Sequence, residues 1–234
     1  IFDSMSNVVA ILSGGMGSRI GGDIPKQYLE VSGKMVIVYC IERFIVNGNI
    51  DAFIIAVNSK WETFLFSKIK SLDIKIPVYF VQAGETRQCT IYNVLQFANS
   101  IFEPLDTIII HDAARPLVTN RIINECIEGC KKYDGVLPVL PMKDTVYQSE
   151  DGMNISALLP RETLFSGQAP EAFKIGKYLE AHKAISREEL LQINGSTEIA
   201  YKAGMNIKMI QGDEINFKIT TPEDLTRFNL LISK

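Results

Sequence analysis

Short runs of consecutive apolar residues alternate with segments of helical spacing in the first half of the chain. The apolar runs cover residues 8–12, 52–57, 78–81 and 107–110. Apolar side chains recur every three or four positions in residues 36–45, 61–69 and 90–97. Continuous apolar runs predict strands buried on both faces, and strands that alternate with helices predict βαβ units. We therefore expect an α/β fold with a mostly parallel central sheet flanked by helices.

The pattern is less regular beyond residue 120, but it still predicts helices and strands. Helical spacing covers residues 121–132, 175–185 and 197–203, and strand-like runs cover 136–140 and 207–210. Thr221 suits the N-cap of a final helix, and Pro222 suits its first position. Because no repeat, linker or low-complexity tract interrupts the chain, residues 1–234 are predicted to form one domain.

Residues 143–160 are polar, and Ser149-Glu150-Asp151-Gly152 is a turn signal between two extended pieces. Two interpretations fit this stretch. It is either a β-arm that projects from the body and mediates a homodimer, or an ordinary surface hairpin.

Composition and charge restrict the function. The chain is 47% hydrophobic and 22% charged, with a formal net charge of -3. It therefore has no global basic field to recruit nucleic acid or a membrane surface, and a bound nucleotide is expected to be small. No apolar run approaches the roughly 18–20 residues that span a bilayer, and no secretion signal opens the sequence. We expect a cytoplasmic protein.

The cysteines and histidines do not predict a zinc or histidine-rich metal site. Cys126 and Cys130 are four positions apart on a predicted helix, and we interpret them as buried apolar residues. The chain has only two histidines, His111 and His182. His111 is interpreted as a packed residue at a strand end.

The first candidate site follows the first predicted strand. Its sequence is Leu12-Ser13-Gly14-Gly15-Met16-Gly17-Ser18-Arg19, followed by Pro25-Lys26-Gln27-Tyr28. Glycines let backbone amides approach an anion closely, while Arg19 and Lys26 supply positive charge suited to phosphate oxygens. The loop thus indicates nucleotide binding.

Two other phosphate-binding motifs can be tested by spacing. A P-loop requires a lysine and a hydroxyl residue directly after its last glycine, and Gly33-Lys34 is followed by Met35. A dinucleotide fingerprint requires a third glycine, where this chain has Ile20. The loop matches neither motif.

Two further clusters are expected near this loop. Asp112 ends the fourth predicted strand and could hold Mg²⁺ through one oxygen, or form a local ion pair with Arg115. The stretch from Gly84 to Thr90 is either a polar turn that faces the same crevice or a capped helix start. Parallel sheets bind ligands at the carboxyl ends of their strands, which favours a shared site.

Four ordered blocks resemble the cytidylyltransferases that make CDP-methylerythritol and CDP-ribitol. They are Gly14-Gly15-x-Gly17-x-Arg19 with Pro25-Lys26-Gln27, Gly84-x-x-Arg87, Asp112-Ala113-Ala114-Arg115-Pro116, and Asn216-x-Lys218-x-Thr220-x-Pro222-Glu223-Asp224-Leu225. The resemblance covers nearly the whole chain. It implies a Rossmann-like nucleotidyltransferase fold, a dimer formed through a β-arm, CTP and a polyol phosphate as substrates, and Mg²⁺ as cofactor.

The resemblance also implies a role for each matching residue. It assigns catalysis to Arg19, Lys26 and Lys218, and Mg²⁺ binding to Asp112. It assigns nucleotide binding to Leu12, Ser13, Gly14, Gly15, Met16, Gly17, Gly84, Arg87, Thr90 and Ala113. It assigns acceptor binding to Arg115, Arg161, Ala169 and Asn194, with Arg161 supplied from the same or the partner subunit.

The acceptor side departs from the family pattern. Asn194-Gly195 stands where the family has Thr-Asp, and Ala169 replaces a threonine. Gly14-Gly15, Trp61 and Gly167-Gln168 resemble the ribitol branch, which feeds teichoic acid and capsule synthesis, whereas Asp112-Ala113-Ala114-Arg115 resembles the methylerythritol branch of isoprenoid synthesis. On this balance we expect ribitol 5-phosphate or a glycerol phosphate as acceptor, with methylerythritol 4-phosphate as the runner-up.

Two other classes of protein are weighed against this enzyme. An NAD-binding oxidoreductase module would need the third glycine that the loop lacks. A nucleotide-binding protein without catalysis would have lost Lys26, Asp112 or Lys218, and all three are present.

Overall fold

The computed structural model describes residues 5–15 and 23–233. Its centre is an eight-stranded sheet in the order β10-β7-β11-β6-β1-β4-β5, with β12 paired to β7. The first four of these strands along the chain are β1 (Asn7–Leu12), β4 (Ala52–Val57), β5 (Val78–Gln82) and β6 (Thr107–Asp112). All four run parallel, as the apolar runs predict, and their carboxyl ends meet at one edge.

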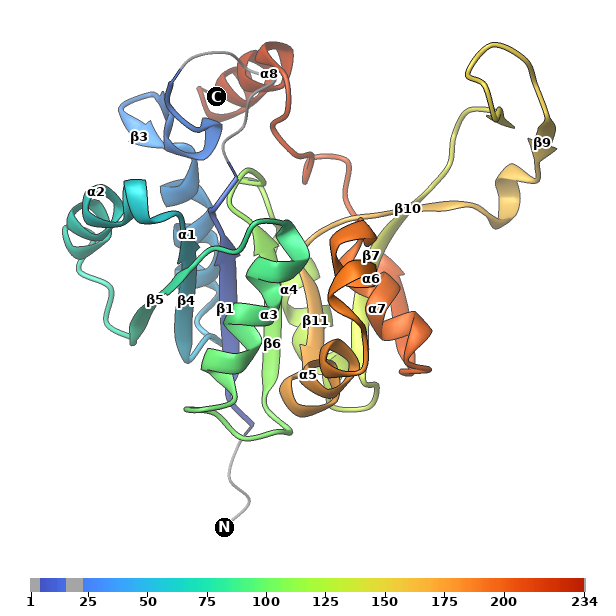
Figure 1. Cartoon of the computed structure of the whole chain (residues 1–234). Helices are drawn as coiled ribbons and strands as arrows, with labels where there is room; N and C mark the ends of the chain where they lie inside the picture. Colours follow the sequence, from blue (N-terminus) through green and yellow to red (C-terminus); the bar gives the residue numbers. More distant parts are fainter. Residues whose placement is uncertain (1–4, 16–22, 234) are drawn as a thin grey trace.

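Side chains from alternate positions of the strands enter two separate cores. Val9 and Ile11 of β1 pack with α1 (Val36–Asn47), α2 (Ser59–Lys70) and α4 (Asn120–Cys130). Val8 and Ala10 pack with α3 (Arg87–Ala98), α5 (Ile175–Lys183), α6 (Arg187–Gln192) and α7 (Ser196–Lys202). Because the side-chain period of a strand is two, one apolar run supplies both faces. The helices accordingly cover both faces of the sheet (Figure 1).

The second half of the sheet is mixed, which the sequence pattern does not predict. β7 (Gly135–Pro141) and β12 (Ile207–Gln211) run parallel, but β11 (Glu171–Lys174) lies antiparallel between β6 and β7. β10 (Phe165–Gly167) is also antiparallel to β7. Strands of three or four residues carry too little periodicity to be distinguished from loops.

A small lobe covers the carboxyl end of the sheet. It contains η1 (Lys26–Tyr28), the hairpin of β2 (Glu30–Val31) and β3 (Lys34–Met35), and α8 (Pro222–Ile232). Phe228 of α8 is buried and meets Tyr39 edge to face. Thr221 caps α8 and Pro222 occupies its first turn, as predicted. In this lobe α8 packs against the segment that contains Val31 and Val36.

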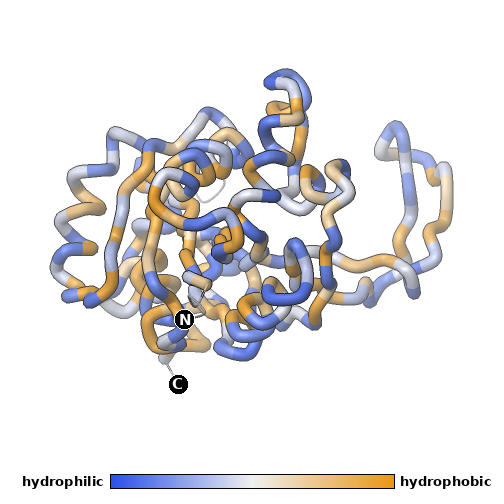
Figure 2. Tube along the Cα trace, turned by 90° about the horizontal axis from the view of Figure 1, so that it is seen from below, coloured by the Kyte–Doolittle hydropathy of each residue, from blue (hydrophilic) through white to orange (hydrophobic). Residues whose placement is uncertain are grey.

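Residues 143–160 project from the body as an arm (Figure 1). Its two extended pieces are β8 (Val146–Gln148) and β9 (Ala157–Leu159), which pair antiparallel, and η2 (Arg161–Thr163) follows them. Asp151 accepts backbone hydrogen bonds from Met153 and Asn154 at the tip. Hydrophobic and hydrophilic residues both occur along the arm (Figure 2). The predicted hairpin is confirmed, and its role in dimerisation stays a prediction.

The predictions for cysteines and membrane spans can also be compared with the structure. Cys126 and Cys130 are fully buried on the inner face of α4, as expected of small apolar residues. Within the described part of the chain, none of the helices has both the length and the apolar character needed to cross a bilayer.

Candidate active site

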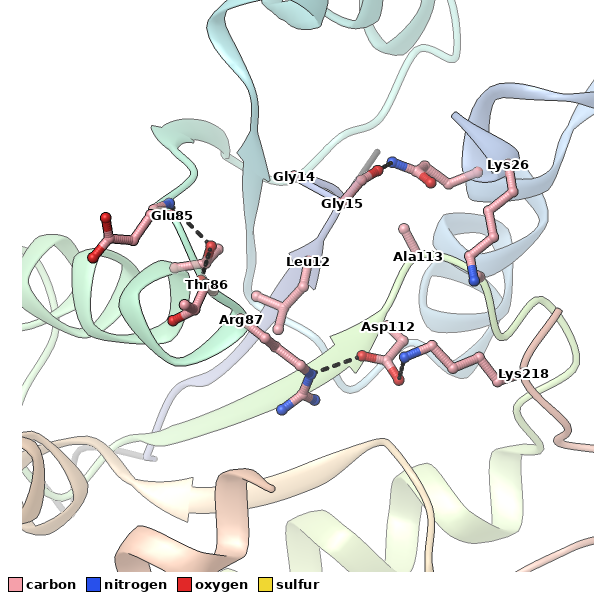
Figure 3. Close-up of a pocket in the computed structure, with 14 residues that line it drawn as sticks. Leu12, Gly14, Gly15, Lys26, Glu85, Thr86, Arg87, Asp112, Ala113 and Lys218 are labelled. Carbon is pink, nitrogen blue, oxygen red and sulfur yellow. Dashed lines mark hydrogen bonds and ion pairs between the residues drawn. The ribbon is translucent and has the colours of Figure 1, made fainter. Parts of the chain in front are cut away.

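A cavity of about 320 Å³ lies at the carboxyl ends of the parallel strands. Three loops meet there, because β1, β5 and β6 all end at this edge. Figure 3 shows Lys26, Asp112 and Lys218 around one space, whereas the side chain of Glu85 points away from it. The lining residues are Leu12, Gly14, Gly15, Lys26, Gln27, Gly84, Glu85, Thr86, Arg87, Thr90, Asp112, Ala113, Ala114 and Lys218. The cavity thus collects residues from all four blocks of the sequence.

The first loop is held by the residues that follow it. The side-chain amide of Gln27 donates 2.8 Å hydrogen bonds to the carbonyls of Ser13 and Gly15. The hydroxyl groups of Ser13 and Tyr28 are hydrogen-bonded at 2.5 Å. A Cβ at Gly14 would lie 2.3 Å from the Cβ of Ala83. The Pro-Lys-Gln segment therefore fixes the loop, and Gly14 lets it pass close to the loop after β5.

The second loop follows β5 and leads into helix α3. Thr86 is the N-cap, and its side chain accepts a hydrogen bond of 3.1 Å from the amide of Cys89. A Cβ at Gly84 would lie 2.5 Å from the Cβ of Cys89, so only glycine fits without movement. Both interpretations of this stretch hold: it is a capped helix start, and it lines the cavity. The positive end of the α3 dipole therefore faces the space where an anion would bind.

Three positively charged side chains surround Asp112 in the cavity. Its carboxylate lies 3.1 Å from Nε of Arg87, 3.2 Å from Nζ of Lys218 and 3.4 Å from Nε of Arg115. Burial by itself would raise the pKa of the Asp112 carboxyl, but these three cations together hold that pKa far below its usual range. Asp112 is therefore ionised at neutral pH, and the predicted local ion pair with Arg115 is present.

The side chains that could bind a metal in the cavity can be compared with the ligands that Mg²⁺ prefers. Among residues 5–15 and 23–233, no three acidic, histidine or cysteine side chains are grouped to hold a metal by themselves. Mg²⁺ at nucleotide sites commonly uses one or two carboxylates, with phosphates and water supplying the other oxygens. The ionised carboxylate of Asp112 fits that mode, since both its oxygens are acceptors and the residue lines the cavity.

His111, the residue before Asp112, is not available for proton transfer. It is fully buried, its Nε2 lies 2.9 Å from the carbonyl of Arg115, and its ring meets Phe44 edge to face. Burial lowers the pKa of His111 to about 4. It is a packed residue, as interpreted from the sequence, and it lies inside β6.

Several predicted site residues lie outside the cavity lining. Ser13, within the first loop, is buried against Tyr28, and Arg115 is held between Asp112 and the carbonyl of Asn216. The structure does not bring the other acceptor residues into the cavity: Arg161 is exposed directly after the arm, Ala169 is buried against Asn216, and Asn194 is exposed before α7. Their roles stay predictions. Met16, Gly17 and Arg19 fall outside the described residues.

Some residues at the site were missed by sequence reasoning. Arg87 Nη2 lies 3.5 Å from Glu171, and its Nη1 donates a hydrogen bond to Ser196. Ala114 lines the cavity beside Ala113. Glu171 belongs to the short strand β11, whose pairing with β6 is non-local. The sequence feature that could have indicated Glu171 is its position at the end of the segment Gln168-Ala169-Pro170-Glu171, which contains the predicted acceptor residue Ala169.

The arrangement is suited to bringing anions together. Lys26, Lys218, Arg87 and the amino end of α3 border the cavity, whereas its carboxylates are Asp112 and Glu85. Fixed positive groups stabilise charge that develops on phosphate oxygens, and a ready anion needs no general base to attack. The chemistry that fits is phosphoryl or nucleotidyl transfer.

Comparison with known proteins identifies the family. Residues 7–234 match the family described as IspD, 2-C-methyl-D-erythritol 4-phosphate cytidylyltransferase. A solved 4-diphosphocytidyl-2C-methyl-D-erythritol synthase is 26% identical, with 98% of this chain and 99% of that one covered and a TM-score of 0.81. The Francisella tularensis enzyme of the same family is 25% identical over 96% and 99%, with a TM-score of 0.81.

A third structure supports the fold. The 4-diphosphocytidyl-2C-methyl-D-erythritol synthase of Anaerococcus prevotii is 20% identical over 98% of this chain and 99% of that one, with a TM-score of 0.80. The α/β nucleotidyltransferase fold is therefore confirmed. The chain belongs to the IspD family of cytidylyltransferases.

Proposed function

We propose that this protein transfers the cytidylyl group of CTP to 2-C-methyl-D-erythritol 4-phosphate. An oxygen of the acceptor phosphate attacks the α-phosphorus of CTP, the bond from that phosphorus to the bridging oxygen breaks, and pyrophosphate leaves. The products are 4-diphosphocytidyl-2C-methyl-D-erythritol and pyrophosphate. The observation that carries this proposal is the convergence of Lys26, Asp112 and Lys218 in one cavity of a chain that belongs to this family.

The charged residues of the cavity have separate roles in this reaction. The first loop and the start of α3 would hold the nucleotide. Lys26 and Lys218 would neutralise the triphosphate and stabilise the charge that develops as pyrophosphate departs. Asp112 would hold Mg²⁺, which supplies charge neutralisation at the phosphates when bound. These roles are chemically consistent with the absence of a nucleophile-base pair among the lining residues that the structure describes.

The proposed acceptor, methylerythritol 4-phosphate, is the runner-up of the sequence analysis, which favours ribitol 5-phosphate or a glycerol phosphate. Two of the residues that point to ribitol, Trp61 and Gly14, have packing contacts in the protein that account for them without reference to an acceptor. Trp61 packs its ring 5.3 Å from that of Tyr28, and Gly14 is required by its close approach to Ala83. Ala169 and Asn194 do not line the cavity. Family membership and the Asp112-Ala113-Ala114-Arg115 block then favour methylerythritol phosphate.

The test is a comparison of acceptors with the purified protein. CTP and Mg²⁺ are supplied with 2-C-methyl-D-erythritol 4-phosphate, ribitol 5-phosphate or glycerol 3-phosphate, and pyrophosphate release is measured. We expect kcat/KM for the first acceptor to exceed the others by roughly tenfold or more, because unmatched hydroxyl groups weaken transition-state binding. ATP, GTP and UTP serve as controls for the nucleotide.

The outcomes separate the two parts of the proposal. Faster turnover of ribitol 5-phosphate would refute the acceptor and leave cytidylyl transfer in place. If CTP releases pyrophosphate with none of the three acceptors, the substrate class itself is wrong.

A further inference from the structure

The guanidinium of Arg87 is shared between two carboxylates. Its Nε donates to Oδ1 of Asp112 at 3.1 Å, and its Nη2 lies 3.5 Å from Oε1 of Glu171. Glu171 is on β11 and pairs in register with Ile110, two positions before Asp112 on β6. Two buried acids on neighbouring strands therefore hold one arginine between them, at the floor of the candidate active site.

Helix α7 fixes both members of this contact. Thr197 Oγ1 donates a 2.6 Å hydrogen bond to Oε2 of Glu171, and Ser196 accepts one from Nη1 of Arg87. The hydroxyl of Tyr178 in turn donates to the carbonyl of Ser196 at 3.0 Å. Glu171 and Ser196 are each at most 7% exposed. The two terminal nitrogens of Arg87 are thus held by Glu171 and Ser196, which do not line the cavity.

This contact matters because Asp112 is surrounded by cations. Lys218 is partly exposed and lines the cavity, so nucleotide phosphates can draw it away from Asp112. Arg115 already donates to the carbonyl of Asn216. Arg87 also lines the cavity, but its side chain is less exposed than that of Lys218, 28% against 37%, and Glu171 and Ser196 hold its terminal nitrogens. We therefore expect its positive charge to stay beside Asp112 when a nucleotide binds. A divalent cation bound at Asp112 would be repelled by the positive charge of Arg87 unless a second anion compensated that charge.

We propose that Glu171 is a positioning residue that, held by Thr197, shares Arg87 with Asp112 and so keeps Asp112 able to hold a divalent cation beside the nucleotide. The inference rests on the proposed function only in assuming a metal-nucleotide complex. It assigns no contact with substrate to Glu171.

The substitution Glu171→Gln tests this inference, because it keeps the shape of the side chain and removes its charge. Mn²⁺ binding in the presence of CTP is measured by the loss of the free-ion EPR signal, without any acceptor. We expect the apparent dissociation constant to rise about tenfold, since one uncompensated charge several ångströms away opposes the cation at an effective dielectric constant of about 20. The Mg²⁺ concentration for half-maximal turnover should rise in parallel, while kcat at saturating Mg²⁺ is largely kept.

Three further variants make the result specific. Thr197→Val leaves the Glu171 charge but removes its hydrogen-bond donor, and should shift metal affinity in the same direction by less. Glu171→Asp should restore part of the affinity. Glu125→Gln on α4 removes one exposed carboxylate from another ion pair and should change nothing.

Two results would overturn the inference. One is unchanged Mn²⁺ affinity in folded Glu171→Gln protein. The other is a loss of kcat that no Mg²⁺ concentration restores while Mn²⁺ still binds normally, which indicates a purely structural role. Since Mn²⁺ and CTP binding needs no acceptor, neither result bears on which polyol phosphate is the substrate.

Discussion

At the scale of single residues, chemistry in this protein depends on where a few charges are fixed. Asp112 meets three cations within 3.4 Å, and its neighbour His111 is buried and uncharged at neutral pH. The two residues are adjacent on β6, so they face opposite sides of the strand end. One therefore serves the cavity and the other packs against Phe44.

Lys26 provides the first prediction. Replacing it by Ala should lower kcat by roughly a hundredfold or more, the loss found when a fixed group that stabilises transition-state charge is removed. The fold should be retained, because Lys26 lies at the cavity rather than in a core. Steady-state pyrophosphate release measures the effect, with Lys70→Ala, an exposed lysine at the end of α2, as control. Near-normal turnover in Lys26→Ala would remove Lys26 from the mechanism.

At the scale of elements, the long helices and strands were predicted and several of the short ones were not. Strand β4 matches its predicted bounds, because six consecutive apolar residues between polar neighbours favour a short buried strand over a helix. Strands β10 and β11 and helix α6 were missed, since three to six residues give no reliable period. Glu171 was missed for the same reason, although its partner Arg87 was named.

The arm is the element whose role can be tested directly. Exposed apolar side chains, including Tyr147, Met153, Ile155 and Leu158, are unusual on an isolated hairpin and favour a second copy as partner. We expect a dimer, twice the 26.2 kDa of the chain, in which Arg161, directly after each arm, reaches the cavity of the other copy. Light scattering after size-exclusion chromatography measures the mass.

Mixed dimers test whether Arg161 acts across the interface. Lys26→Ala and Arg161→Ala chains, each poorly active alone, should regain about a quarter of wild-type activity when unfolded and refolded together. Half of the dimers are then mixed, and each has one site with both residues intact. Mixing Lys26→Ala with Lys218→Ala chains should also restore activity only if these two residues act in different chains, so no recovery is expected there. No recovery in the first mixture either would place Arg161 outside the partner's site.

At the scale of the whole molecule, the two cores bury both histidines. His182 donates from Nδ1 to the carbonyl of Tyr178, and burial lowers its pKa to about 4, as it does for His111. Each histidine is thus harder to protonate in the folded than in the unfolded chain. The stability that the two buried neutral histidines contribute is present above pH 6.5 and declines as the pH falls toward 4.

Acidification should therefore destabilise the protein well before its carboxylates titrate. Between pH 7.5 and pH 5, each histidine should lower the free energy of unfolding by about 2 kcal/mol. Urea titrations at the two pH values measure the difference, and His182→Gln should remove about half of it. Equal stability at both pH values would show that the histidines titrate normally in the folded state.

The sequence by itself determined the alternation of strands and helices, the position of the glycine loop and the identity of the cations, because these depend on local order along the chain. Only the tertiary structure decided which residues meet. β11 enters the sheet antiparallel and brings Glu171 to Arg87, and the terminal segment returns to place Lys218 beside Asp112. Such contacts join positions far apart in sequence, and no local pattern encodes the pairing that creates them.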